Sequence, residues 1–373
     1  METFGTDGFR PVPRVLMGPG PSSVHYRVYQ AMATPVIGYL DPQLLSCMDQ
    51  ISEMLRGLFQ TKNPVTLALS ATGGAGMEAA FFNFIEPGDT IIIGVKGFFG
   101  ERMTEVAART GAKIIRVDQE WGKAIEPERM IKALKEHPEA KICAVVHAET
   151  STGARQPLEE IGATCKKTDT LFLVDAVTSL GACEVKVDAW GIDIAYSCSQ
   201  KGISVPPGMS PITISPKATD VLRSRKTPVQ SWYFDLSLIE KYWGTQRVYH
   251  HTAPASMFYA LREGLRIVSE EGLEARFKRH EEMGDRLKME LERLGFNLFA
   301  QEGYRLSMLT SAYLPAGVED VPTRKKLLND YGIEVGGGLG KVSGKIWRVG
   351  LMGESCRLQT IHSLVSALEE ILA

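Results

Sequence analysis

The sequence lacks several features that would place it in common functional classes. No uninterrupted apolar run is long enough to span a bilayer, and the N-terminus has no basic segment followed by an apolar one. The formal net charge is only -2 over 373 residues, so electrostatics does not favour nucleic acid or an anionic membrane. We therefore expect a cytoplasmic globular protein with neither nucleic acid nor a membrane as partner.

Cysteine and histidine are present, but without the spacing of a disulfide framework or a metal site. The six cysteines include no Cys-x-x-Cys pair, and several lie in apolar runs, which is typical of buried free thiols in a reducing compartment. The seven histidines show no ligand spacing; His250 and His251 are adjacent and cannot both point one way from a strand. A metal hydrolase therefore has little support.

What the chain does contain, from residue 65 onward, is an alternation of short β-rich runs with helical patterns. The predicted strands are 65–70, 90–95, 113–117, 141–146, 171–174, 193–197 and 211–215. Such alternation predicts an α/β large domain, in which a mostly parallel seven-stranded sheet lies between helices. Around residue 258 the pattern changes to two long amphipathic helices followed by short strands. We therefore expect a large domain over 1–257 and a smaller C-terminal α+β domain over 258–373.

Lys201 follows one of these predicted strands and is the most informative single residue. Lysine is among the residues least often buried, and burying it unpaired is costly, so its place beside a core strand needs a reason. One reason is an unprotonated amine that condenses with a carbonyl group, as the cofactor pyridoxal phosphate (PLP) requires. The other is a loop lysine with its ammonium in water. Other parts of a PLP site must decide between them.

Two further strand ends carry residues that suit such a site. The strand at 65–70 runs into Thr72, Gly73 and Gly74 at the start of a helix, where backbone N–H groups could hold a phosphate. A tight turn without a ligand is the alternative, and no Walker A lysine follows. Asp175 ends the strand at 171–174 and could pair with a pyridinium nitrogen, or cap the next turn.

Seven motifs occur in order along the chain. They are Gly-Pro-Gly-Pro at 18–21, the glycine-rich turn before Met77, His-Ala-Glu-Thr-Ser-Thr-Gly at 147–153, Val-Asp-Ala-Val-Thr-Ser-Leu-Gly at 174–181, Ser-Gln-Lys at 199–201, Tyr-His-His-Thr at 249–252 and Trp-Arg-Val-Gly at 347–350. From about residue 15 to the C-terminus, the chain resembles the class V, fold-type-I PLP aminotransferases. Within them it most resembles the alanine–glyoxylate and serine–pyruvate aminotransferase branch.

The resemblance implies a role for each matching residue. Lys201 would bond to the cofactor aldehyde and move the proton, and Asp175 would pair with the pyridine nitrogen. Arg348 would clamp the substrate carboxylate, for which a bidentate guanidinium is suited. The other implied cofactor contacts are Thr72, Gly73, Gly74, Phe99, Thr150 and Gln200, with Tyr249 and Thr252 reaching the neighbouring site of a homodimer. The other implied substrate contacts are Gly18 and Thr150.

Three residues depart from the common family pattern. Phe99 stands where tryptophan is common, Gly74 where histidine is common, and Thr150 where serine is common. The resemblance implies transfer of an amino group from alanine or serine to glyoxylate or pyruvate by ping-pong kinetics. The alternatives are a ureidoglycine–glyoxylate or pyridoxamine–pyruvate transaminase, a cysteine-desulfurase-like lyase, and a non-catalytic PLP-fold subunit. A lyase would need a histidine in place of Gln200 and a mobile cysteine, for which Cys356 is the only loop-like candidate.

Overall fold

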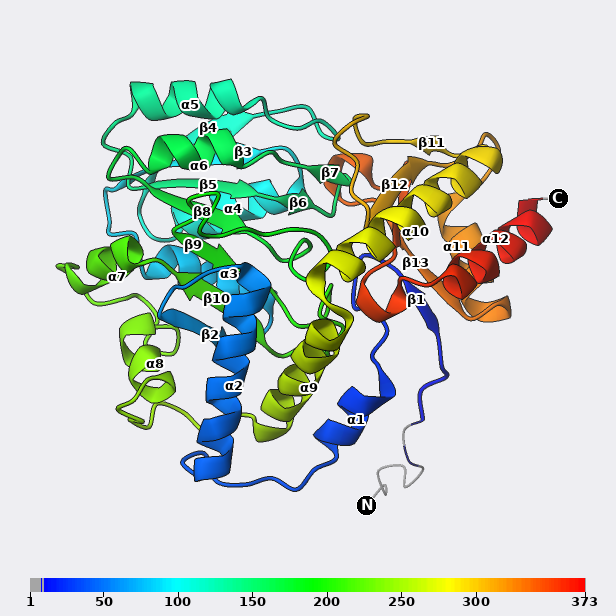
Figure 1. Cartoon of the computed structure of the whole chain (residues 1–373). Coiled ribbons are helices and arrows are strands. Elements are labelled where there is room, and N and C mark those ends of the chain that lie inside the picture. The colour runs from blue at the N-terminus through cyan, green and yellow to red at the C-terminus, as the bar shows by residue number, and fades with distance from the viewer. Residues whose placement is uncertain (1–7, 9, 373) are drawn as a thin grey trace, which may run out of the picture.

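A seven-stranded sheet with helices on both faces dominates the computed structural model, which describes residues 8 and 10–372 (Figure 1). In sheet order its strands are β2 (Val65–Leu69), β10 (Ser210–Ile214), β9 (Ile194–Tyr196), β8 (Leu171–Asp175), β5 (Ile142–Val146), β3 (Thr90–Val95) and β4 (Lys113–Asp118). Only β10 runs antiparallel to its neighbours in this sheet. The predicted α/β architecture is confirmed, because each of the seven predicted runs is one of these strands.

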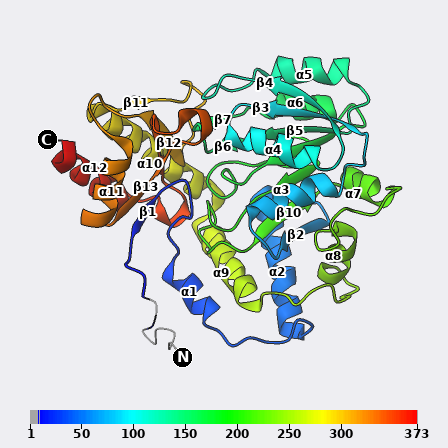
Figure 2. The same cartoon turned by 180° about the vertical axis from the view of Figure 1, so that it is seen from behind.

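Helices on both faces explain why the central strands are apolar without alternation. Ile91, Ile92 and Ile93 follow one another in β3, and all three are 0% exposed. A strand with one face in water would alternate, whereas a continuous apolar run requires cover on both faces. Figure 1 shows α5 (Pro127–Glu136) and α6 (Glu159–Cys165) in front of the sheet, and Figure 2 shows α3 (Gly73–Phe82) and α4 (Phe98–Ala108) on the opposite side.

The open edge of the sheet, at β2, is covered by helices from both ends of the large unit. α2 (Pro42–Phe59) packs on β2, and α8 (Leu236–Trp243) and α9 (Ala255–Glu271) pack on α2. α1 (Tyr26–Met32) packs on α9, and α7 (Pro216–Arg223) follows β10. The sequence sets the bounds of α2 directly. Asp41 caps its start by accepting the N–H of Gln43 at 2.8 Å, and Pro42 takes the first helical position. Gln60 ends the helix in the left-handed region with φ 51°.

A second, five-stranded sheet forms the smaller unit. Its strands, in sheet order, are β1 (Val15–Met17), β13 (Ile333–Gly337), β14 (Ile346–Gly350), β12 (Leu309–Tyr313) and β11 (Asn297–Leu298). The helices α10 (Leu273–Arg293), α11 (Asp320–Asp330) and α12 (Leu358–Leu372) and the short turns η1 (Gly340–Val342) and η2 (Gly353–Ser355) complete it. Met17 and Trp347 belong to its separate hydrophobic core, although Met17 is near the N-terminus. The domain boundary at residue 257 stays a prediction.

A short hairpin, β6 (Ala148–Glu149) with β7 (Ala154–Arg155), follows β5 and lies against the smaller unit. Its Ala148 packs with Leu306, Met308 and Met352 in a third apolar cluster. Ligands of open α/β sheets bind beyond the carboxyl ends of the strands, which is where this hairpin and the first turns of α3 and α4 lie. Among the described residues, none of the helices has the length and apolar character needed to cross a bilayer.

Candidate active site

Asp175 and Lys201 come from adjacent parallel strands. Asp175 is the last residue of β8 and pairs in register with Tyr196 at the end of β9, after which the chain turns to Lys201. The Asp175 carboxylate is buried and accepts hydrogen bonds from the Val177 N–H and the Tyr196 hydroxyl, both at 2.8 Å. Burial raises the pKa of Asp175 to about 6 and lowers the pKa of Lys201. The two groups are close enough for each charge to act on the other.

The Gly-Pro-Gly-Pro turn lies directly against Lys201. The Lys201 amine donates to the Pro19 carbonyl oxygen, and the Ser22 hydroxyl donates to the Lys201 carbonyl oxygen at 2.8 Å. A Cβ on Gly20 would lie 2.8 Å from Lys201 Cδ, closer than carbon atoms can pack. Gly20 also has a φ of 122°, which other residues rarely adopt, and any side chain there would displace the end of the lysine.

The first turn of α3 faces the same region. Thr72 is its N-cap residue but makes no capping hydrogen bond with its side chain, and Gly73 and Gly74 open the helix. A Cβ on Gly73 would lie 2.9 Å from Cys198 Cβ, so this helix end packs against the segment that leads to Lys201. The Gln200 Oε1 atom in that segment is buried without a hydrogen-bond partner among the described residues. The free N–H groups at the helix start form a suitable anion site. The Gln200 Oε1 atom is an acceptor and needs a donor.

Phe99 and Thr150 come from two elements that contact each other at this edge of the sheet. Phe99 lies half-buried in the first turn of α4, and Thr150 is buried in the β6–β7 turn. The hairpin touches α4 through Ser151, whose hydroxyl accepts the Phe98 N–H at 2.9 Å. Hydrogen bonds from the backbone of α4 thus hold its first turn, which carries Phe99, against the turn that carries Thr150.

Arg348 reaches the site from the smaller sheet. It lies in β14, is 7% exposed, and donates from Nε to a backbone carbonyl of β13 at 2.7 Å. Its register partner Gly336 packs against Pro19, where a Cβ would lie 2.5 Å from the proline Cδ, and Gly18 packs against β14. Burial lowers the pKa of Arg348 to about 10, and its charge in turn lowers the pKa of Lys201. The turn at 18–21 therefore connects Arg348 with Lys201.

Tyr249 and Thr252 lie apart from the buried residues around Lys201, and both are exposed. Tyr249 is 51% exposed on the segment after α8, and its hydroxyl lies 3.5 Å from that of Thr252. The Tyr249 ring also contacts Tyr39, with 4.7 Å between the ring centroids. These two residues point to the surface and are not enclosed in the buried group around Lys201.

Sequence reasoning missed three residues of this region. Tyr196 was only part of an apolar run, yet its hydroxyl holds the Asp175 carboxylate. The Pro19 carbonyl holds the Lys201 amine, a contact across 182 positions that no local pattern could reveal. Glu149 was one letter of the motif at 147–153, but its carboxylate is 0% exposed and accepts several hydrogen bonds. The only available signal was an acidic residue between small residues.

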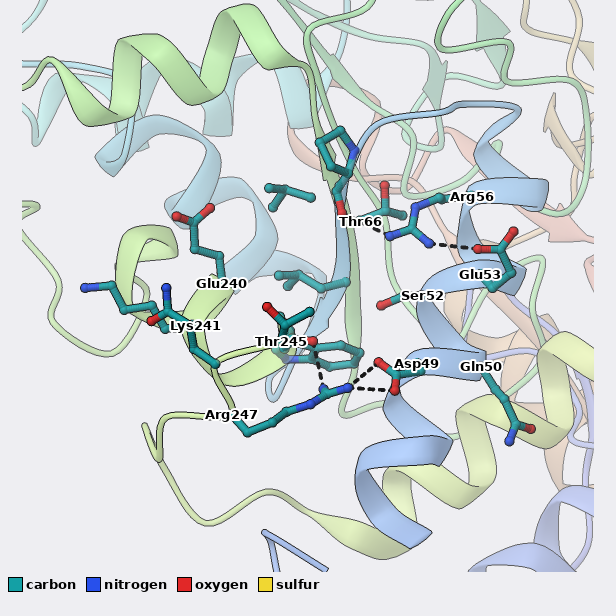
Figure 3. A pocket seen from close by; sticks show the side chains of 16 residues that line it. Asp49, Gln50, Ser52, Glu53, Arg56, Thr66, Glu240, Lys241, Thr245 and Arg247 are labelled. Carbon is teal, nitrogen blue, oxygen red and sulfur yellow. Dashed lines mark hydrogen bonds and ion pairs between the residues drawn. The ribbon is translucent and has the colours of Figure 1, made fainter. Parts of the chain in front are cut away.

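A cavity of about 730 Å³ lies elsewhere, at the β2 edge (Figure 3). Its lining comes from α2, from 64–67 and from 240–247, and is therefore separate from Lys201 and Asp175. On its floor the Arg247 guanidinium meets both oxygens of Asp49 at 2.6 Å and also donates to a backbone carbonyl of α8 at 2.9 Å. These bonds tether the segment that carries Tyr249.

Cysteine and metal chemistry find little support in the geometry. Cys356 is 0% exposed, and burial raises the pKa of its thiol to about 11, which disfavours a thiolate nucleophile. Among residues 8 and 10–372, His, Cys, Asp and Glu side chains form no cluster of three that could hold a metal ion. The buried Cys356 thiol is consistent with the prediction that disfavours a lyase.

The groups gathered around Lys201 fit PLP. The free N–H groups at the start of α3 suit a phosphate, and the buried Asp175 carboxylate suits a cationic ring nitrogen. The Lys201 amine contacts the Pro19 carbonyl and lies near Asp175, and Phe99 is half-buried in the first turn of α4. An amine of lowered pKa, on the segment that packs against a helix start with free N–H groups, suits a covalently bound aldehyde phosphate.

Comparisons with known proteins agree with this geometry. The family model of the class-V aminotransferases matches residues 23–358. The (S)-ureidoglycine–glyoxylate transaminase of Bacillus subtilis (strain 168) is 42% identical over 377 residues, covering 96% of this chain and 90% of that protein. The alanine–glyoxylate aminotransferase of Drosophila melanogaster is 38% identical over 364 residues, covering 96% and 92%. The crystal structure of alanine–glyoxylate aminotransferase from Nostoc sp. superposes with a TM-score of 0.97 at 48% identity, covering 99% of this chain and 98% of that one. The chain therefore belongs to the class V aminotransferases, and it is a PLP-dependent enzyme of fold type I.

Proposed function

We propose that this aminotransferase moves an amino group from alanine or serine to glyoxylate or pyruvate by a ping-pong mechanism. The observation that carries the proposal is one buried arginine, Arg348, held close to the Lys201 amine by the turn at 18–21. One guanidinium suits a substrate with one carboxylate. The nearby Arg324 is already paired with Asp320 at 2.6 Å. The relatives named for glyoxylate chemistry support a small keto acid as acceptor.

In this proposal, the protein binds PLP at the two polar ends of the cofactor, the phosphate and the ring nitrogen. The N–H groups of Gly73 and Gly74, the Thr72 hydroxyl and the Gln200 amide would hold the phosphate, because the helix start carries partial positive charge. Asp175 would hold a positive charge on the ring nitrogen; its pKa, raised by burial, would fall again beside that cation. Phe99 would cover one face of the ring.

The remaining residues would act on the substrate. When bound, PLP supplies an electron-accepting ring that makes the substrate Cα–H acidic. The Lys201 amine, whose pKa is lowered first by burial and further by Arg348, is suited to remove the Cα proton at Nζ and return it. The Arg348 guanidinium would fix the substrate carboxylate in a bidentate pair and so orient the Cα–H bond toward Lys201. Thr150 and Gly18 would line the substrate side.

The proposal includes a homodimer in which Tyr249 and Thr252 complete the neighbouring site. Its support is an exposed aromatic surface around these residues, formed by Tyr39, Trp232, Tyr233 and Tyr249, which are 38–61% exposed. The Tyr39 ring contacts that of Tyr249, and Trp232 and Tyr233 contact the adjoining His250. Large exposed aromatic groups gathered on one surface are typical of protein interfaces. The Tyr249 hydroxyl, exposed and next to Thr252, is free to reach a phosphate on another chain.

A second candidate is transfer from (S)-ureidoglycine to glyoxylate. The Bacillus subtilis relative that carries this name is 42% identical to the chain, and its crystal structure superposes with a TM-score of 0.96 at 43% identity. Both candidates share glyoxylate and the same residues for proton transfer. They differ only in the amino donor.

The amino donor can be identified by half-reactions of the PLP-loaded enzyme. Alanine, serine and (S)-ureidoglycine would be mixed singly with the enzyme, and conversion of bound PLP to its amine form would be followed by absorbance. We expect alanine or serine to react with the larger rate constant per molar of donor. Faster conversion with ureidoglycine would transfer the assignment to the second candidate, and no conversion with any of the three would contradict both.

The shared site can be tested with mixed dimers of two inactive variants, Lys201→Ala and Tyr249→Phe combined with Thr252→Ala. If sites are shared, one of the two sites in a mixed dimer contains only wild-type residues, so activity should return on mixing. Activity that stays absent on mixing, or a monomer that is fully active, would contradict the dimer.

A further inference from the structure

We propose that Glu149 is a positioning residue of the active site, whose buried carboxylate fixes the first turn of α4 and therefore the ring of Phe99. The proposal rests on the proposed role of Phe99 as the ring that covers the cofactor. It adds a residue that acts on the site through α4 and through its charge, without itself contacting the substrate.

The hydrogen bonds of the hairpin show how Glu149 acts. The N–H of Phe98 donates to Ser151 Oγ at 2.9 Å, and the N–H groups of Phe99 and Gly100 donate to the two oxygens of Glu149 at 3.4 and 3.3 Å. Ser151 donates to the same carboxylate from its hydroxyl at 2.6 Å and its N–H at 3.1 Å. The start of α4 is thus capped entirely by the β6–β7 hairpin, and an anion there also favours the helix dipole.

Gly97 makes this close approach possible. It is the N-cap residue of α4 and has no side chain that could cap the helix itself. A Cβ at this position would overlap with Glu149 Cγ and Cδ and would lie 2.6 Å from Ser151 Oγ. Its φ of 179° is ordinary extended backbone, so space rather than conformation requires glycine here. The Glu149 carboxylate therefore contacts the start of α4 directly, so a movement of the carboxylate would also move the first turn of the helix.

The charge of Glu149 also reaches the groups assigned to chemistry. Burial lowers the pKa values of Arg348, Lys201 and the buried Lys96, and the negative charge of Glu149 partly offsets this lowering in all three. A carboxylate that is 0% exposed needs such cations, because an uncompensated buried charge is costly. A substrate carboxylate at Arg348 would be a second anion near the same guanidinium. Removing the charge of Glu149 should therefore strengthen carboxylate binding while it loosens α4.

The test is Glu149→Gln in the PLP-loaded enzyme. Glutamine keeps the size of the side chain but loses the charge and cannot accept hydrogen bonds at both ends. We expect a changed visible circular dichroism of bound PLP, a kcat lower by at least about tenfold, and a KM for the keto acid that is unchanged or lower. Glu101→Gln is the matched control, because Glu101 lies in the same first turn but pairs with Arg116 at 2.8 Å on the surface. It should leave both the spectrum and kcat unchanged.

A second variant separates capping from charge and serves if the first does not fold. Ser151→Ala removes the cap on Phe98 and keeps the charge of Glu149, so it should change the dichroism and lower kcat less strongly, at unchanged KM. The proposal is overturned if Glu149→Gln keeps dichroism and kcat within about twofold of wild type, or raises KM at constant kcat. Unchanged dichroism in Ser151→Ala overturns it as well. A wild-type enzyme that borohydride fails to label with PLP at Lys201 would instead contradict the proposed site.

Discussion

Replacing Asp175 by asparagine measures how much folding stability is lost when this buried carboxyl group ionises. The carboxylate is 3% exposed, and burial raises its pKa from the ordinary 3.8 to about 6. Asparagine has nearly the same shape and can still accept the Val177 N–H. In the protein without cofactor, the variant should therefore differ from wild type mainly by the absence of an ionising group.

The sign and size of the effect follow from proton linkage. Because the folded state holds the proton of Asp175 more tightly than the unfolded state, the associated stability is fully present below about pH 4 and is lost as the pH rises through about 6. The pKa difference of roughly two pH units corresponds to about 3 kcal/mol at 1.36 kcal/mol per unit. The free energy of unfolding of Asp175→Asn minus that of wild type should rise by about this amount from pH 4 to pH 7.

Urea unfolding of the cofactor-free proteins at a series of pH values provides the assay. Asp285→Asn is the control, because that side chain is 75% exposed, and its difference from wild type should stay within about 0.5 kcal/mol. With PLP present at pH 7, wild type should be more stable to urea than Asp175→Asn. Asparagine cannot balance a cationic ring nitrogen, so the variant should bind PLP more weakly. A difference that does not change with pH would refute the argument from burial. Equal PLP affinity in both proteins would refute the pairing of Asp175 with the ring.

Three further predictions concern the amine, the arginine and the tethered segment. Borohydride should fix PLP to the wild-type protein at Lys201 and not to Lys201→Ala, as peptide mass analysis would show; a labelled variant would place the bond elsewhere. Arg348→Ala should raise KM for the keto acid by at least about tenfold, with the Kd of PLP within about twofold of wild type, because one bidentate pair is lost. If both constants rise equally, the arginine is structural. Asp49→Ala should free Arg247 and weaken PLP binding several-fold by loosening the segment that carries Tyr249, whereas Glu53→Ala in the same cavity should not; equal affinities would exclude a tether.

The large sheet could be predicted from sequence because its strands carry local signals. A continuous apolar run such as Ile91 to Ile93 must be buried on both faces of its sheet. Because helical patterns alternate with these runs, helices provide the cover, and the fold is of the α/β class. The strands β1 and β13 carry no such signal. β1 has only three residues, and β13 contains two glycines, which are unfavourable in strands. They are strands because Val15 to Met17 pair with Ile333 to Val335, and the pairing of such distant segments has no local trace.

The same distinction applies to the site. Lys201, Asp175 and the turn at 72–74 were predicted because each follows a strand in a recognisable motif. The Tyr196 hydroxyl on Asp175 depends on the register between β8 and β9, which composition does not specify. Glu149 was missed for a similar reason. Its hydrogen bonds depend on how closely the hairpin approaches α4, and only the glycine at 97 permits that approach.

The pairing of β1 with β13 also has a chemical consequence. It attaches the turn at 18–21 to the smaller sheet, and that turn places the Pro19 carbonyl on the Lys201 amine of the larger one. Arg348 is in the smaller sheet as well, with Pro19 packed on its register partner Gly336. A displacement of the smaller sheet would therefore move Arg348 and the carbonyl that contacts Lys201 together. The backbone of residues 18–21 thus links the sheet that carries Arg348 to the Lys201 amine, and in the proposed function this link would orient a small substrate between the two groups.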